Sequence, residues 1–289
     1  MGGAWQIGAL AAVADALDWD PRTAEVIVGT SSGASTAALL GSGVGVEELV
    51  AAQRGADGAR ASVRRFFTSP PAGRPRVPVP LPISLRLAAA GIRSRSRLLA
   101  LSGLAPRGRS ETAFLADIPE QATHPATWIV TVDADTGARV AFGAPGAPPA
   151  SLRAAVRASW AVPGWFPAVR IGGRRYLDGG AYSPTSADLL TDLGLDEVVV
   201  IAPMASANDE SVPGVAGRAE RLLRTPMSRI VTAETAALRA AGTRVLLVHP
   251  AAELADLGPN FMDPRRRLAA LASALRHVPV RLATQGIPS

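Results

Sequence analysis

A long uncharged stretch, residues 26–46, constrains the fold of this chain more than any other feature of the sequence. It is long enough to span a bilayer, but its many Gly, Ser and Thr residues would make it insert poorly. Residues 25–28 carry a run of β-branched side chains, which predicts a short buried strand ending at Gly29. Small residues from Ser32 to Leu40 then predict a helix. The stretch therefore indicates a buried strand, a tight turn and a buried helix in a globular protein.

The remaining apolar segments predict strands that alternate with helices. Helices are expected at residues 4–17, 151–160 and 185–193, and further strands at 128–132, 139–142, 198–202 and 244–248. Asp135-Thr136-Gly137 is a hairpin-turn signal between the strands at 128–132 and 139–142. Buried strands interleaved with helices are typical of an α/β fold in which a mostly parallel sheet is covered on both faces.

Composition excludes several kinds of chemistry. The chain has 289 residues, enough for a sizeable core in one α/β domain, and a formal charge of +6. All of its basic side chains are Arg, so a Gly-Lys-Ser/Thr phosphate loop, a Schiff base and a Ser–Lys dyad are impossible. Cysteine is absent, which excludes disulfides, thiol nucleophiles and thiolate metal sites. The arginines lie among acidic residues, so we expect no nucleic-acid partner.

Residues 54–110 differ in character from the rest of the chain. They contain Arg64-Arg65, a proline-rich piece from Pro70 to Pro82, and arginines at positions 93, 95 and 97. We interpret the segment as a cap or substrate-access insert within a single domain, residues 1–289. A long surface excursion without a function is the open alternative.

A G-x-S-x-G motif supplies a candidate nucleophile. Gly29-Thr30-Ser31-Ser32-Gly33 falls directly between the expected strand and helix, which is the context that a nucleophile elbow requires. The tight turn would expose the hydroxyl of Ser31, and the N–H of Ser32 would point at a developing oxyanion. Ser32 itself is better placed to cap the helix, and Ser35 lies within it. A plain strand–turn–helix junction is the alternative for the motif as a whole.

A serine nucleophile needs a base, and the histidines are weak candidates for that role. His124 precedes Pro125 in a loop, and His277 lies in an arginine-rich C-terminal helix. His249 ends an expected strand, so it is the only one of the three positioned as a triad histidine can be.

A carboxylate offers a second candidate base. Asp178 ends a short expected strand and is followed by Gly179 and Gly180, which let the backbone turn sharply and approach the nucleophile loop. Burial in an apolar site raises the proton affinity of a carboxylate, which suits it to accept the serine proton. Taken alone, Asp-Gly-Gly is more simply a turn.

The two motifs together resemble the patatin-like phospholipase family. The similarity extends to residues 158–167 before Asp178, residues 183–188 after it and residues 258–263 near the C-terminus. It covers most of the chain and is weakest at 54–110. The resemblance implies a three-layer α/β/α sandwich and hydrolysis of lipid acyl esters without a metal or cofactor. It also implies a dyad, with Ser31 as nucleophile and Asp178 as base, and an acyl-enzyme on Ser31.

The start of the chain departs from the family pattern. Family members begin with a strand and a glycine-rich oxyanion loop, whereas this chain begins Met1-Gly2-Gly3. The first strand therefore lacks a counterpart, and only Gly2 and Gly3 stand for the loop. Two interpretations stay open: a start placed too late, which we favour, or a truncated and impaired relative.

The sequence thus predicts a serine hydrolase of lipid carboxylic esters, with an acyl lipid as its substrate. The alternatives are a Ser-His-Asp esterase that uses His249 and a catalytically impaired binding protein. The N-terminus lacks the layout of a secretory signal, so we expect a cytoplasmic protein. Arginines between 64 and 109, and at 265–267, give it a means of peripheral contact with anionic membranes.

Overall fold

The computed structural model describes residues 2–69, 76–205, 215–251 and 263–285, with only the backbone for 215–223. The chain forms two compact units. The central unit comprises Arg22–Val44 and Arg60–Pro184. The terminal unit comprises Met1–Pro21, Gly45–Ala59 and Thr185–Ser289.

The central unit is built on a mixed sheet with the strand order β1-β4-β7-β6, and β5 also pairs with β4, off this path. Its strands are β1 (Ile27–Thr30), β4 (Thr127–Asp133), β5 (Arg139–Phe142), β6 (Val169–Ile171) and β7 (Arg174–Asp178). β1 runs parallel to β4, whereas β5 and β7 pair with β4, and β6 with β7, in the antiparallel sense. Every residue of β4 is buried, which fits its position inside the sheet.

Helices flank this sheet. They are α2 (Ser32–Gly41), α4 (Ala61–Thr68), α5 (Leu85–Arg93), α6 (Arg97–Leu104) and α7 (Leu152–Ser159). Short 3₁₀ helices are η1 (Pro21–Thr23), η2 (Ala113–Asp117) and η3 (Gly179–Ala181), and a small antiparallel pair joins β2 (Val79–Pro82) to β3 (Pro106–Arg107). Both α5 and α6 begin with a serine N-cap, Ser84 and Ser96, whose hydroxyl accepts a backbone N–H.

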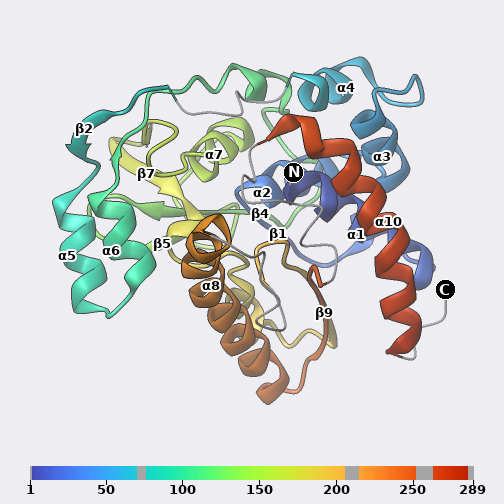
Figure 1. Ribbon diagram of the computed structural model, residues 1–289. Helices are drawn as coiled ribbons and strands as arrows, with labels where there is room; N and C mark the ends of the chain where they lie inside the picture. The colour runs from blue at the N-terminus through green and yellow to red at the C-terminus, as the bar shows by residue number, and fades with distance from the viewer. Residues whose placement is uncertain (1, 70–75, 206–214, 252–262, 286–289) are drawn as a thin grey trace. The chain divides into compact units, whose positions relative to one another are not determined.

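Helices α5 and α6 form a hairpin that packs on the sheet (Figure 1). The two helices approach closely because glycines lie at their contact: a Cβ on Gly91 would lie 2.2 Å from the Ala100 nitrogen. Leu87 of α5 and Leu99 of α6 enter the same core cluster as Leu177 of β7. The expected insert at 54–110 therefore contains an ordered helical hairpin anchored on the sheet.

The terminal unit combines helices with a second, parallel pair of strands. Its elements are α1 (Gly2–Ala16), α3 (Val46–Arg54), η4 (Ala187–Leu193), β8 (Glu197–Ile201), α8 (Val215–Ala240), β9 (Arg244–Val248), η5 (Pro264–Arg266) and α10 (Arg267–Thr284). Helices α1 and α10 lie against each other (Figure 1), because Gly8 brings the α1 backbone against Leu271 and Ala274. Trp5 and Val13 of α1 share a core with Val248 of β9.

The α/β class is confirmed, and most expected elements fall within two residues of their observed bounds. The hairpin at 128–142 forms as expected, with Gly137 in the left-handed region at φ 75°. The helix expected at 185–193 forms as a 3₁₀ helix that begins at Ala187. Ser186 is left-handed there, and both Thr185 and Ala187 donate hydrogen bonds to Glu234 of α8, which fixes the segment against that helix.

Candidate active site

The Gly-Thr-Ser-Ser-Gly motif forms a strained turn between β1 and α2. Ser31 follows the last residue of β1 and is the N-cap of α2, with φ 56° and ψ −121°. A non-glycine residue in such a conformation costs about 1–3 kcal/mol and persists only where its surroundings hold it. Here the Ser31 N–H donates to the Ser159 hydroxyl oxygen over 2.8 Å, and that hydroxyl donates to the Val130 carbonyl over 2.7 Å. Ser159 thus ties the turn to the central strand β4.

The flanking glycines of the motif are explained by the same turn. A Cβ on Gly29 would lie 2.3 Å from the carbonyl oxygen of Gly33, so no side chain fits at that position. The strand before Ser31 and the first turn of α2 after it therefore pass in backbone contact, which is the close approach that the motif predicts.

Asp178 ends β7 directly beside this turn. The residue pairs with Thr131 of β4 in the sheet register and is only 4% exposed. Its carboxylate accepts a hydrogen bond from the Gly180 N–H over 2.7 Å, and the Ser31 side chain lies near enough to lower its pKa as a hydrogen-bonding neighbour. The structure thus brings together the two side chains that the sequence analysis paired across 147 positions of the chain (178 − 31).

Gly179 allows the aspartate to come this close. A Cβ at that position would lie 2.7 Å from the Val130 carbonyl oxygen and 3.0 Å from the Thr30 side chain. The backbone that follows Asp178 therefore runs against the residue that precedes Ser31. A larger residue at 179 would push the carboxylate away from the hydroxyl.

Burial also determines the proton affinity of the carboxylate. Loss of solvent raises the pKa of Asp178 to about 6, although hydrogen bonds from the Gly180 N–H and the Ser31 hydroxyl oppose the rise. A carboxylate with this pKa is ionised near neutral pH, yet binds a proton more strongly than an exposed one. Those are the properties required of a general base.

The rival serines and histidines are engaged elsewhere. Ser32 is the first residue of α2 and follows its N-cap, Ser31. The Ser35 oxygen accepts the Trp160 indole N–H over 2.6 Å. His124 bonds to Ala24 and Ala126 backbone groups.

The two other histidines belong to the terminal unit. His249 follows the last residue of β9, and its Nδ1 lies 2.9 Å from the Pro250 carbonyl oxygen. His277 lies in α10 beside the Ser273 hydroxyl. Gly2 and Gly3, the predicted oxyanion donors, open helix α1 and do not form a separate loop.

An aromatic cluster lies next to the serine turn. We define it as Phe66, Phe114, Trp160 and Phe166. Phe114 stands at its centre, with its ring centroid 6.3 Å from Phe66, 5.1 Å from Trp160 and 6.1 Å from Phe166. Trp160 anchors the cluster to α2 through Ser35, one helical turn beyond Ser31. Phe166 is fully buried, whereas Phe114 and Trp160 keep part of their surface accessible.

Sequence reasoning missed Phe66, Phe114 and the role of Ser159. Phe66 and Phe114 lie 48 positions apart (114 − 66), so no local pattern joins them. Ser159 sits in the segment that resembles the family, and that resemblance was the only signal available for it.

The aspartates at 133 and 135 build the hairpin turn. The Asp133 carboxylate accepts the N–H groups of Asp135 and Thr136, and ion pairs join Asp133 to Arg174 and Asp135 to Arg175. This supports the hairpin interpretation of Asp135-Thr136-Gly137. In the described ranges no group of three or more His, Cys, Asp or Glu side chains is arranged to hold a metal ion.

The fold and the turn place this chain among α/β proteins that present a serine between a strand and a helix. A family model for patatin-like phospholipases matches residues 1–191, well over half of the chain. The protein therefore belongs to the patatin-like phospholipase family, a family of lipid acyl hydrolases. No curated protein matches the sequence.

The match ends within η4, so residues 192–289 lie beyond it. Most of the segment at 258–263, which resembles bacterial family members, lies outside the described residues. Among the helices described, none has the length and apolar character needed to cross a membrane.

Proposed function

We propose that this protein is a serine hydrolase of lipid carboxylic esters that works through a Ser31–Asp178 dyad. One observation carries the proposal: the serine on the strained turn is a hydrogen-bonding neighbour of a buried carboxylate. A serine hydroxyl becomes an effective nucleophile when a positioned base accepts its proton. The raised pKa of Asp178 supports the assignment of that base.

The reaction would proceed in two halves. Ser31 Oγ attacks the acyl carbonyl as its proton passes to Asp178, and the ester C–O bond of the tetrahedral intermediate then breaks. The leaving alkoxide takes the proton from Asp178, which leaves an acyl group on Ser31. Water then gives a proton to Asp178 and attacks this ester, and the released Ser31 oxygen recovers the proton.

Negative charge on the carbonyl oxygen requires donors. We assign this role to the N–H of Ser32. Ser32 opens α2, and the first N–H groups of a helix have no intrahelical acceptor. Removal of one such donor costs about two to three decades in rate.

The aromatic cluster is the part of the site that we assign to the acyl chain. It is attached to α2 one turn beyond the nucleophile, and two of its rings remain partly accessible. An acyl chain against these rings would lose its contact with water, which favours an apolar substrate by about 25 cal/mol per Å² of apolar surface buried.

Hydrolysis of a short-chain p-nitrophenyl ester tests the dyad. We expect Ser31→Ala and Asp178→Asn each to lower kcat by at least a thousandfold, because each removes one half of the proton transfer. Ser102→Ala and Asp192→Asn are matched controls at positions outside the proposed site and should retain wild-type rates. Full activity of folded Asp178→Asn would contradict the proposal.

The same assay separates the two alternatives. A Ser-His-Asp esterase would lose its activity in His249→Ala, whereas the dyad predicts that this variant keeps it. A catalytically impaired binding protein would show no turnover in the wild type, and no difference between wild type and Ser31→Ala.

A further inference from the structure

Residues 58–110 form the most one-sidedly charged part of the chain. The segment contains eleven arginines and not a single Asp or Glu. Across the whole chain, 30 basic residues are balanced by 24 acidic ones, so this segment departs from the general mixture of charges. The sequence-based expectation that arginines lie among acids does not hold here. Such a segment favours a negatively charged partner.

The helical hairpin of this segment exposes apolar side chains as well. Leu85 and Ile92 of α5, and Leu101 and Leu104 of α6, are each more than half exposed. At about 100° per residue, Leu85 and Ile92 lie roughly 140–160° around α5 from the buried Leu87. Both therefore point away from the sheet.

Helix α6 repeats this arrangement. Leu101 and Leu104 lie roughly 140–160° around the helix from the buried Leu99, and the exposed Arg97 shares their side. Leu87 and Leu99 enter the same core cluster, so the two exposed sides face the same way. We call this surface the hairpin face: Leu85, Arg86, Ile92, Arg93, Arg97, Leu101 and Leu104.

The charges of the hairpin face are available to a partner. Among the described residues, no carboxylate forms an ion pair with Arg86, Arg93 or Arg97. Elsewhere in the same segment Arg65 pairs with Asp117 and Arg76 with Glu111. The hairpin is thus a part of the segment where guanidinium groups stand beside exposed leucines and the described residues supply no counter-ion.

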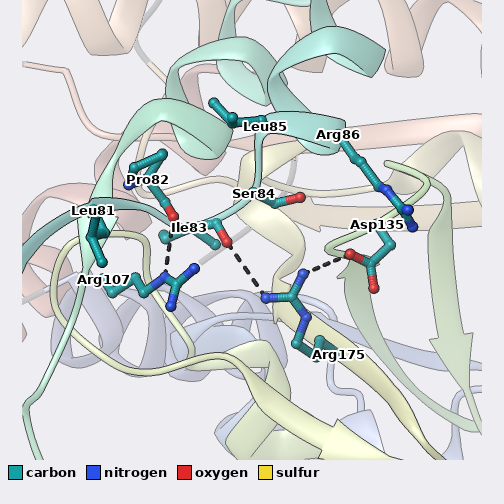
Figure 2. Close-up of a pocket in the computed structure, with 9 residues that line it drawn as sticks. All are labelled: Leu81, Pro82, Ile83, Ser84, Leu85, Arg86, Arg107, Asp135 and Arg175. Carbon is teal, nitrogen blue, oxygen red and sulfur yellow. Dashed lines mark hydrogen bonds and ion pairs between the residues drawn. The ribbon is translucent and has the colours of Figure 1, made fainter.

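A pocket of about 490 Å³ opens at the start of α5, at the edge of the hairpin face. Leu81 and Leu85 are among its lining residues, and Figure 2 shows the Arg107 guanidinium bonded to the Pro82 carbonyl. Arg175 is held by Asp135 and the Ile83 carbonyl, whereas the described part of the chain offers no carboxylate partner to the other two lining arginines, Arg86 and Arg107.

This pocket is distinct from the candidate active site. Arg175 and Asp178 are three residues apart on β7, so their side chains point to opposite faces of the sheet. The pocket adds a concave, cationic and partly apolar site to the hairpin face.

We propose that the hairpin face docks onto the surface of a bilayer that contains anionic phospholipids. Leu85, Ile92, Leu101 and Leu104 would enter the boundary between headgroups and acyl chains. The arginines would contact phosphates at headgroup level, with the pocket at Arg86 and Arg107 receiving one headgroup.

Charge complementarity favours an anionic bilayer over a second copy of the chain as the partner of the hairpin face. A two-fold contact would set the same acid-free, arginine-bearing surface against itself, which is electrostatically unfavourable. An anionic bilayer accommodates both features at once, because it neutralises the arginines and buries the leucines. The proposal does not depend on the dyad.

Vesicle flotation of the full chain tests the proposal. Phosphatidylcholine vesicles are compared with vesicles that also contain phosphatidylglycerol, in a Ser31→Ala background so that hydrolysis cannot alter the lipid. We expect binding to the anionic vesicles only, and a marked decrease at high salt, since salt screens exposed charges.

Two pairs of substitutions then address the hairpin face. Arg86→Gln with Arg93→Gln should weaken binding by about fivefold for each arginine. Ile92→Asn with Leu101→Asn should weaken it by about tenfold for each apolar residue. The matched control is Leu268→Asn with Arg276→Gln on α10, both exposed, which should bind like the parent.

Circular dichroism verifies that each variant is folded. Arg86→Lys with Arg93→Lys, which keeps the charge, should bind within a few-fold of the parent. Equal binding to neutral and anionic vesicles would overturn the proposal, as would unchanged binding by both surface pairs. A dimer in solution that Ile92→Asn with Leu101→Asn dissolves would assign the hairpin face to a second copy instead.

Discussion

The substitution Asp178→Asn should stabilise the protein while it abolishes activity. The wild-type carboxylate is almost completely buried, and the desolvation that raises its pKa to about 6 is a cost of folding whenever the group is ionised. Asparagine has nearly the same shape and carries no charge. Its oxygen can still accept the Gly180 N–H, so the turn after β7 keeps its main hydrogen bond.

The size of the effect follows from the difference between the folded and unfolded pKa. The carboxyl titrates near 3.8 in the unfolded chain and at about 6 in the fold, a difference of about two units. At about 1.4 kcal/mol per unit, ionisation in the fold costs roughly 3 kcal/mol. The folded protein binds the proton more tightly, so the contribution of Asp178 to the free energy of unfolding falls as pH rises from about 4 to about 6.

Urea denaturation of both proteins at several pH values measures this effect. At pH 8 we expect Asp178→Asn to have a free energy of unfolding roughly 2–3 kcal/mol above that of the wild type, and below about pH 4 the two should converge. Asp192→Asn, at an exposed position, serves as the control and should show no such dependence. A variant that is less stable than wild type by the same amount at every pH would refute the reasoning, because Asp178 would then act as a hydrogen-bond acceptor and not as a buried charge.

Three further predictions concern the same site. The value of kcat/KM should rise as the pH increases through about 6, since Asp178 must be ionised to accept the Ser31 proton. A pH–rate profile that is flat between about pH 5 and about pH 8 would contradict this prediction. Ser159→Ala should lower kcat at least tenfold with little change in KM, because it removes the hydrogen-bond partner of the Ser31 N–H and of the Val130 carbonyl. Steady-state kinetics measure this effect, and an unchanged kcat would show that the turn keeps its conformation without Ser159. Gly179→Ala should lower the free energy of unfolding by about 1–3 kcal/mol and remove most of the activity, because its Cβ would lie 2.7 Å from the Val130 oxygen. Thermal and urea denaturation measure the loss of stability. An unchanged stability would mean that the backbone after Asp178 shifts without cost.

Local patterns in the sequence predicted much of the site. Gly29 and Gly33 flank Ser31 at fixed spacing, and the backbone contact between them explains why the motif can be recognised without a structure. Asp178 ends a strand as expected, and the glycine after it allows the approach to Thr30. Their pairing could be expected only because the two motifs together resemble a known family.

Long-range contacts could not be predicted in the same way. Ser159 supports Ser31 across 128 positions. Its hydroxyl accepts a hydrogen bond from one backbone N–H and donates one to a backbone carbonyl, an arrangement that has no sequence signature. The α5–α6 hairpin was likewise hidden, because its arginines masked two short helices that Leu87 and Leu99 anchor in a core cluster with the sheet. The 3₁₀ form of η4 depends on Glu234 of α8, which lies far along the chain.

Covalent labelling by a fluorophosphonate probe tests the central claim most directly. The probe reacts with an activated serine, and peptide mass spectrometry identifies the residue that carries it. We predict one adduct, on Ser31, which forms much more slowly in Asp178→Asn and at the normal rate in His249→Ala. An adduct on another serine, or no adduct on the folded wild-type protein, would contradict the account.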